Sequence, residues 1–322
     1  MSWRVQDGFF NTGPFAIAQT NDGYIWIGTK SGILRFDGVR FLPWSAEHGE
    51  QLPSTDVYRL LAATDGSLWI ASLGGLSRWK DHTLTNYPSR PGGVVSILQD
   101  NKGRIWFGAN VAQGGTGAFC EVLEGTTRCY GEADGLPFLD GAPDLLQDRN
   151  GDFWIAAYEK LARWNPRSHS VYPLSVDAPR ANGIKNLALS PDGTLWVGVA
   201  RSGPGFGLER FNEGHWSSFK KGSFDSSTLS VQALYADRQG ALWIGTFDGG
   251  IYRIYGDQVD RFDSTSGLSG DWVLGFTEDR EGNLWVVTTT GVDRFADTPV
   301  ISLSSKERLC SYEAASLTAS HD

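Results

Sequence analysis

Short apolar runs alternate with polar turns along most of this chain. The clearest stretch carries the turn Asp22-Gly23, the run Tyr24-Ile25-Trp26-Ile27 and then Ile33-Leu34-Arg35-Phe36 before a second turn at Asp37-Gly38. β-Branched and aromatic runs bounded by such turns predict two short antiparallel strands. Because a lone hairpin of this size is marginal in water, the pattern predicts one part of a larger β structure.

The same unit recurs seven times, each time with a tryptophan three residues after a turn glycine. Successive copies are 37 to 48 residues apart. The tryptophans are Trp26, Trp69, Trp106, Trp154, Trp196, Trp243 and Trp285. A further strand with a central arginine, such as Leu76-Ser77-Arg78-Trp79, follows in every unit except the third, which has Phe119-Cys120-Glu121-Val122.

A period near 40–45 residues with four strands per unit is typical of a propeller blade. The repeats therefore predict an all-β fold, a seven-bladed β-propeller of four-stranded antiparallel blades. The tryptophans are expected to pack between blades, and the arginine stems to pack on aromatic rings. The inner strands are expected to begin near Ala16, Val57, Val94, Asp144, Ile184, Val231 and Val273.

The two ends of the chain bear on how the ring closes. Residues 3–8 resemble an outer strand without its blade, so we expect them to pair with the seventh unit and close the ring. Pro299-Val300-Ile301-Ser302-Leu303 also reads as that unit's outer strand and competes for the same place. Residues 311–322 resemble the start of an eighth unit. The predicted boundaries are 1–303 for the propeller and 304–322 for an incomplete, loosely packed repeat of a longer protein.

Composition limits which classes of partner and which cellular locations are expected for this protein. The formal net charge is −9 and no basic run occurs, which argues against nucleic acid as a partner. No stretch approaches 18 consecutive apolar residues, so no direct membrane contact is expected. No signal peptide is recognised after Met1. The protein is therefore expected to be cytoplasmic if the chain is complete, or exported if the signal lies upstream.

Cys120 and Cys129 are predicted to face each other in the third unit. Glu124-Gly125 has the form of a two-residue hairpin turn, and counting outward from it places the two cysteines opposite each other at a non-hydrogen-bonded position. A disulfide and a pair of buried thiols both fit this spacing, and export would favour the disulfide. Cys310 has no evident partner.

The block from Gln19 to Gly38 resembles the two-component regulator propeller repeat, as do Glu278–Val286 and Gly240–Thr246. The resemblance covers about residues 1–303 in all seven units. It implies the periplasmic or extracytoplasmic sensor of a hybrid histidine kinase, with a second propeller, a transmitter module and a homodimer in the full-length protein. It implies no shared catalytic residues, and an oligosaccharide or other small polar ligand. Ala71 and Ala156 depart from the glycine after Trp-Ile, where a small residue suffices.

Candidate binding groups come from the loops that leave the second strand of each blade. Together with the loops entering the inner strands, these gather on one side of a propeller, which we call the loop face. Two of them are long and glycine-rich, at residues 109–117 and 199–207. Such loops on a rigid scaffold often carry binding groups, although drift in exposed loops explains them equally well. The candidate ligand-binding residues are Asn110, Gln113, Tyr158, Glu159, Arg201, Phe206, Phe247 and Asp248.

An enzyme and a protein-interaction scaffold are the alternatives. Some seven-bladed propellers are metal-assisted lyases or lactonases that use His and carboxylate groups at the channel mouth. Here His82, His169 and His215 are expected on the opposite side, the turn face, and His48 on the loop face. No pair of histidines has metal-ligand spacing, so neither a catalytic site, a metal nor a cofactor is predicted. A free-standing scaffold remains open because propeller faces serve both purposes.

Overall fold

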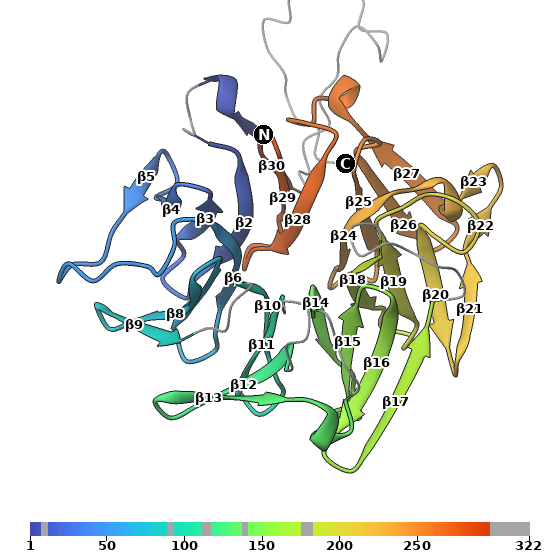
Figure 1. The fold of residues 1–322 in the computed structure, drawn as a ribbon. Coiled ribbons are helices and arrows are strands. Elements are labelled where there is room, and N and C mark those ends of the chain that lie inside the picture. The colour runs from blue at the N-terminus through green and yellow to red at the C-terminus, as the bar shows by residue number, and fades with distance from the viewer. Residues whose placement is uncertain (8–11, 89–92, 111–116, 137–140, 175–182, 297–322) are drawn as a thin grey trace, which may run out of the picture.

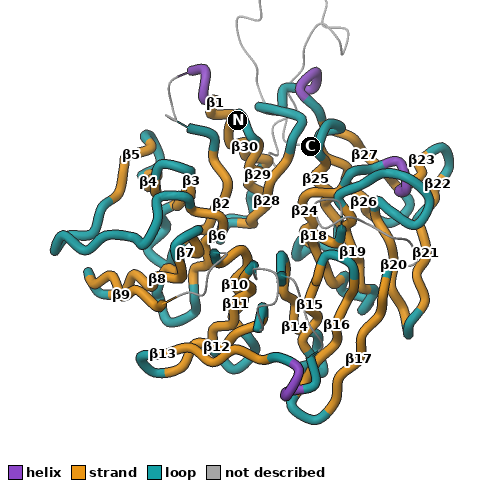
Figure 2. The backbone as a smooth tube through the Cα atoms, viewed as in Figure 1, coloured by secondary structure: helices purple, strands orange, loops and turns teal. Residues whose placement is uncertain are grey.

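The computed structural model describes residues 1–7, 12–88, 93–110, 117–136, 141–174 and 183–296. Within them the seven units form seven four-stranded antiparallel sheets, set around a ring like the blades of a propeller (Figure 1). Helix in this part of the chain is limited to three-residue 3-10 turns (Figure 2). The predicted fold is confirmed.

Each blade runs from an inner strand at the centre to an outer strand at the rim. Blade 1 contains β2 (Pro14–Gln19), β3 (Ile25–Thr29), β4 (Gly32–Phe36) and β5 (Phe41–Trp44). Blade 2 contains β6 (Val57–Ala62), β7 (Leu68–Ser72), β8 (Gly75–Lys80) and β9 (Thr83–Pro88). Blade 3 contains β10 (Val94–Gln99), β11 (Ile105–Ala109), β12 (Phe119–Leu123) and β13 (Thr126–Tyr130). Blade 4 contains β14 (Asp144–Gln147), β15 (Phe153–Ala157), β16 (Lys160–Asn165) and β17 (Ser168–Pro173).

The remaining blades follow the same order, and blade 7 borrows its outer strand. Blade 5 contains β18 (Ile184–Leu189), β19 (Leu195–Val199), β20 (Leu208–Asn212) and β21 (His215–Ser218). Blade 6 contains β24 (Val231–Ala236), β25 (Leu242–Thr246), β26 (Ile251–Tyr255) and β27 (Gln258–Phe262). Blade 7 contains β28 (Val273–Glu278), β29 (Leu284–Thr288), β30 (Gly291–Phe295) and β1 (Ser2–Arg4). Outside the blades lie β22 (Lys220–Lys221), β23 (Phe224–Asp225), η1 (Val5–Asp7), η2 (Glu132–Asp134), η4 (Ser226–Thr228) and η5 (Ser264–Ser266).

The N-terminal strand closes the ring, as predicted. β1 pairs antiparallel with β30, with Trp3 opposite Val292. Asp293 is buried and accepts hydrogen bonds from the hydroxyls of Ser2, at 2.5 Å, and Ser269, at 2.6 Å. These bonds join the first residues of the chain to the last blade. The competing strand predicted at residues 299–303 and the tail at 304–322 lie outside the described residues.

The blade tryptophans pack between neighbouring blades, as predicted. Trp26 and Ile33 of blade 1, for example, form one buried cluster with Val57 and Leu68 of blade 2. The third-strand arginine lies over the tryptophan of its own blade in six units, as Arg210 does over Trp196 at 4.8 Å. The packing role expected for these arginines is confirmed.

Blade 3 also has an arginine over its tryptophan ring, but this arginine comes from a different position, and a glutamate occupies the usual arginine position. Glu121 stands opposite Trp106, where the other blades have arginine. Arg104, which directly precedes β11 and lies two residues before Trp106, is 5.0 Å from the Trp106 ring and pairs with Glu121 at 2.9 Å. The one unit whose sequence departs from the repeat therefore retains the same contact by another route.

In six blades the tryptophan also forms a hydrogen bond with the turn that precedes it. In blade 6 the indole N–H of Trp243 donates to Asp237 Oδ2 at 2.8 Å. The other oxygen of Asp237 accepts the backbone N–H groups of Gln239 and Ala241, which shapes the turn. The residue six positions before the tryptophan is the indole acceptor in six blades: Thr20, Asp100, Asp148, Ser190, Asp237 and Asp279. Blade 2 has Ala63 at this position.

Close packing between blades explains the glycine that follows Trp-Ile in the repeat. A Cβ on Gly28 would lie 2.6 Å from Val57 Cγ1 of the next blade, and one on Gly245 would lie 2.6 Å from Val273 Cγ1. Adjacent blades thus approach each other where the second strand nears the loop face. Ala71 and Ala156 are fully buried at the same position.

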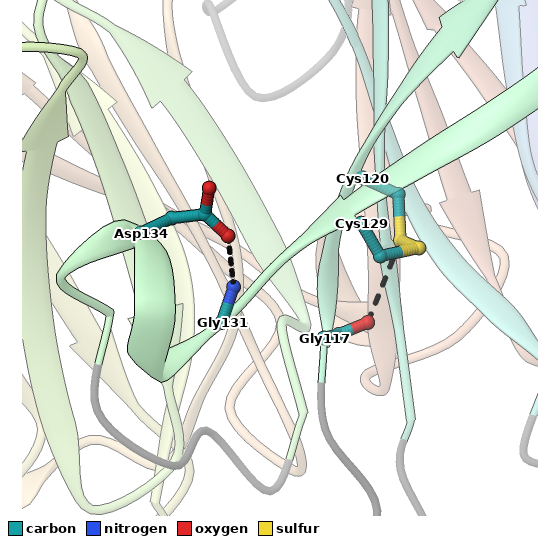
Figure 3. The surroundings of a disulfide bond; sticks show 5 residues. All are labelled: Gly117, Cys120, Cys129, Gly131 and Asp134. Carbon is teal, nitrogen blue, oxygen red and sulfur yellow. Dashed lines mark hydrogen bonds between the residues drawn. A yellow bond between two sulfur atoms is a disulfide. The ribbon is translucent and has the colours of Figure 1, made fainter.

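The structure joins Cys120 and Cys129 by a disulfide (Figure 3). The two residues face each other across β12 and β13, with their Cα atoms 4.0 Å apart. The sulfur of Cys120 lies 3.4 Å from the carbonyl oxygen of Gly117, at the end of the long loop of blade 3. The bond therefore staples the outer hairpin of that blade close to where this loop rejoins the sheet.

We predict that Asp237→Ala lowers the free energy of unfolding by about 2–3 kcal/mol, because it leaves a buried indole N–H and two turn N–H groups without their acceptor. Asp237→Asn retains one side-chain oxygen and should lose less. Asp192→Ala is the matched control, since Asp192 accepts only the N–H of Thr194 in its turn. Denaturant unfolding measures all three. An equal loss for Asp237→Ala and Asp192→Ala would contradict the role of the indole bond.

We predict that the double variant Cys120→Ser/Cys129→Ser loses about 2–3 kcal/mol of stability, the chain-entropy effect of a loop of this length. A reducing agent should lower the melting temperature of the wild-type protein. It should leave the melting temperature of the double variant unchanged, which separates the disulfide from other effects of the reductant. No shift in the wild-type protein would contradict the prediction.

Candidate functional site

The inner strands begin at the loop face with a shared irregularity. In six of the seven blades the pairing of the inner strand shifts by one residue just after its start, for example between Pro14 and Ala16 in β2. Such a bulge re-aims the extra side chain. The extra residues, all partly exposed, are Phe15, Tyr58, Val95, Lys185, Gln232 and Leu274. These side chains of mixed character lie at the beginning of the inner strands, near the loop face, and Leu274 packs against the core between blades 7 and 1.

Several of these residues contact each other or the predicted site. The rings of Phe15 and Tyr58, from adjacent blades, have centroids 6.5 Å apart. Lys185 Nζ lies 4.8 Å from the ring centroid of Tyr158. The hydroxyl of Tyr158 donates to Asn110 Oδ1 at 2.8 Å. Asn110 and Tyr158, two predicted ligand-binding residues from blades 3 and 4, are thus brought together at the channel mouth.

Two charged residues of the inner strands stand close to this cluster. The carboxylate of Asp144 accepts the backbone N–H groups of Leu145 at 3.0 Å and Leu187 at 2.8 Å. Burial raises the pKa of Asp144 to about 6, although those amides and the charge of Arg59 act in the opposite direction. Burial also lowers the pKa of Arg59, and the charges of Asp144 and Tyr158 offset part of that effect.

Neither charged residue was predicted as a site residue. Arg59 and Asp144 lie in strands that read as structural, and the repeat pattern does not mark either position. Ionisable side chains whose pKa is shifted by burial and by a charged neighbour occur at functional sites more often than elsewhere. The signal available in the sequence was the presence of charged residues in inner strands that otherwise carry apolar ones.

The other predicted site residues lie apart from this cluster. Phe206 is 7% exposed and packs in the core between blades 4 and 5, with Arg201 at 4.8 Å over its ring. Glu159 is exposed, and its backbone carbonyl accepts the N–H of Leu174. Gln113 lies outside the described residues. Phe206 therefore supports its loop from within, while Arg201 and Glu159 remain on the surface.

An exposed aromatic pair stands at the loop face between blades 6 and 7. Phe247 is 46% exposed, and its ring centroid lies 4.5 Å from that of Trp272, which is 39% exposed. Asp248 follows Phe247 and is exposed. We call these three residues the aromatic platform. Trp272 was not predicted, because it lies in the connection between two blades, away from the repeated tryptophan.

His82 lies in the turn between β8 and β9, and His169 and His215 lie at the beginning of the fourth strands β17 and β21, close to the turns where they were expected. His48, which was expected on the loop face, lies in the exposed connection between β5 and β6 beside Glu47, whose carboxylate is 2.7 Å from His82 Nδ1. In the part of the chain that the structure describes, no group of three or more His, Cys, Asp or Glu side chains could hold a metal ion. The absence of an activity stays a prediction.

A protein-family model described as "Two component regulator propeller" matches four segments of the chain, at residues 8–31, 89–110, 225–248 and 267–290. These segments fall in blades 1, 3, 6 and 7. Four of the seven blades thus contain a match to the two-component regulator propeller repeat. No curated protein sequence matches it. The resemblance inferred from the repeated Asp-Gly turns and tryptophans is confirmed.

Solved structures share this regulator propeller fold. The extracellular domain of a hybrid two component system from B. thetaiotaomicron is 17% identical with a TM-score of 0.74, over 90% of this chain and 40% of that chain. A one component system from the same organism is 19% identical with a TM-score of 0.69, over 88% of this chain and 38% of that one. Virginiamycin B lyase from Staphylococcus aureus is 16% identical with a TM-score of 0.70, over 92% of this chain and 98% of the lyase.

These similarities show the fold and allow the length of this chain to be compared with that of the matched proteins. The regulator propeller spans about 40% of the length of the first of these extracellular domains. It spans nearly all of the lyase, which has the same architecture. Since identity is below 20% in each case, what these proteins bind or do is a statement about them. None of the described helices is long and apolar enough to cross a membrane.

We predict that the stability of the wild-type protein, relative to Asp144→Asn, falls as the pH rises from about 4 to about 6. The pKa of Asp144 is raised from its ordinary 3.8 to about 6 on folding, so the folded state holds more protons than the unfolded state in this window. Above the window the wild-type protein carries the full penalty of the buried charge. Unfolding of both proteins across this pH range measures the difference, and a difference independent of pH would contradict the raised pKa.

Proposed function

We propose that this propeller is the ligand-sensing region of a two-component signalling protein, and that it binds a polar ligand such as an oligosaccharide at the loop face. Its repeats are those of two-component regulators, and the fold recurs in extracellular domains of such systems. The observation that carries the ligand proposal is the aromatic platform. Exposed rings beside an exposed carboxylate suit a ligand with a flat apolar face and hydroxyl groups.

The loop face offers two kinds of contact to such a ligand. The aromatic platform supplies stacking surface and the carboxylate of Asp248. The channel mouth supplies Asn110, Tyr158 and Lys185, which already form a connected polar group. A rigid ring of sheets holds both. Binding would then bias how this propeller packs against a second propeller or a second copy of the protein, and so alter a transmitter module.

An extracytoplasmic location agrees with this function. Disulfides persist in oxidising compartments and are rare in the cytosol of most organisms. The bond between Cys120 and Cys129 joins β12 and β13 in the outer hairpin of blade 3. We therefore propose a periplasmic or extracellular location for the propeller.

We predict that a panel of oligosaccharides contains a ligand that raises the melting temperature of the protein. For that ligand, Trp272→Ala should weaken binding roughly ten-fold or more, since a stacked aromatic anchor carries a large share of binding energy. Calorimetric titration measures the dissociation constants. Tyr255→Ala is the matched control, because Tyr255 is as exposed as Phe247 (46% for both) but lies at the hairpin turn of blade 6.

The two parts of the loop face can be tested separately with the same ligand. Asn110→Ala and Arg201→Ala remove polar groups from the long loops without touching the aromatic platform. If these variants and Trp272→Ala all bind as the wild-type protein does, the ligand site lies elsewhere. If the panel contains no ligand at all, the oligosaccharide proposal fails.

A further inference from the structure

A second concave surface lies between blades 3 and 4, away from the aromatic platform. It encloses about 1150 Å³ and is lined by the turns between the inner and second strands of both blades, together with η2 and the hairpin turn of blade 4. We call it the basic groove. Its charged lining residues are Lys102, Arg104, Arg128, Arg167, Asp134 and Asp152, with His169 at one wall. Four permanent cations thus face two carboxylates, in a protein of net charge −9.

The carboxylates of the groove already have partners. Asp134 pairs with Arg128 at 3.0 Å and accepts the backbone N–H of Gly131 at 3.0 Å. Asp152 pairs with Arg163 at 2.5 Å and accepts the side-chain amide of Asn165 at 2.6 Å. These acceptors are engaged within the protein, so the groove offers a ligand mainly donors.

The donors differ in how far they are engaged. Arg104 is held between Asp100 at 2.8 Å and Glu121 at 2.9 Å. Within the described ranges, Lys102 and Arg167 form no ion pair, and both side chains are exposed. Exposed ammonium and guanidinium groups on opposite blades therefore remain for a partner that carries oxyanions.

The shape of the groove is held by close packing. The ring of His169 lies against the backbone of Gly135, where a Cβ would be 2.3 Å from His169 Nδ1. Gly135 has φ of 80°, which a glycine adopts without strain. The indole N–H of Trp164 donates to the carbonyl of Asp134 at 2.9 Å. Contacts between blade 4 and η2 of blade 3 thus fix the wall before any ligand arrives.

The aromatic residues at the bottom of the groove are not free to stack. Trp106 is 1% exposed, Trp164 3% and Phe153 2%. Single-stranded nucleic acid binds through bases stacked on exposed rings, and this groove presents none of these rings to it. Amide side chains line the rest, including Asn101 and Asn150. The lining suits a hydroxylated, anionic chain better than a base.

We infer that the basic groove binds an acidic polysaccharide through its sulfate or carboxylate groups. Arg167 and Lys102 contact the oxyanions from the two blades, and the amide side chains meet the hydroxyl groups between them. The volume exceeds the roughly 300–1000 Å³ of a pocket for one drug-sized molecule, so a run of sugar residues fits better than a single one. The site is separate from the loop face and does not depend on the function proposed there.

The test compares charged and neutral polymers on one protein. Dextran sulfate and polygalacturonate serve as the sulfated and carboxylated probes, dextran as the neutral one, and single-stranded DNA as the phosphate polymer. Binding is measured by calorimetric titration at low and at moderate salt. We expect one or both acidic polysaccharides to bind, dextran not to bind, and affinity to fall as salt rises.

The variant Lys102→Ala/Arg167→Ala should weaken binding of the acidic polysaccharide roughly ten-fold or more, because it removes charge-assisted contacts on both sides of the groove. Lys30→Ala/Arg40→Ala is the matched control. It makes the same change in net charge with exposed residues of blade 1. Circular dichroism shows whether each variant folds as the wild-type protein does.

Three results would overturn the inference. The first is that neither acidic polysaccharide binds. The second is that both variants weaken binding equally. The third is that DNA binds more tightly than either polysaccharide and depends on Lys102 and Arg167 in the same way. Equal weakening would mean that net charge alone attracts the polymer. None of these results bears on the ligand of the aromatic platform, whose own variants decide that question.

Discussion

The hydrogen bond between the blade tryptophan and the residue six positions before it ties the fold together. An indole that fills the space between two blades must bury its N–H, and a buried donor without an acceptor is costly. In four blades an aspartate accepts the indole N–H with one oxygen and shapes the turn between the inner and second strands with the other: Asp100, Asp148, Asp237 and Asp279. The same side chain thus sets local geometry and permits the tertiary contact.

A second set of contacts carries this arrangement from blade to blade. Gln99, at the end of the inner strand of blade 3, accepts the N–H of Thr64 in blade 2 at 2.9 Å. Gln147 and Gln19 do the same for Asn101 and Arg280. The last of these joins blade 1 to blade 7, the interface at which the ring closes. The turns are therefore held by their own tryptophans in six blades and, at these three interfaces, by the next blade as well.

The irregular segments of the propeller, its bulges and connections, lie at the loop face and the turn face. The bulges at the start of the inner strands send side chains toward the channel mouth, and the connection between blades 6 and 7 exposes Trp272 beside Phe247. On the other side, the blades diverge toward the rim, and the gap between blades 3 and 4 becomes the basic groove. Rigid sheets with variable edges allow one propeller to offer chemically different surfaces without changing its core.

The sequence by itself determined the seven blades, the inner strand starts, the closing strand and the opposition of Cys120 and Cys129, because each follows from local turns and strand periodicity. Tertiary structure alone decided which loop residues are available. Phe206 and Arg201 lie in one glycine-rich loop, yet the first is buried against the preceding blade. Asp144 and Arg59 come together from strands far apart in the chain. A repeat fixes what each blade looks like, whereas burial and charge at a site depend on how several blades meet.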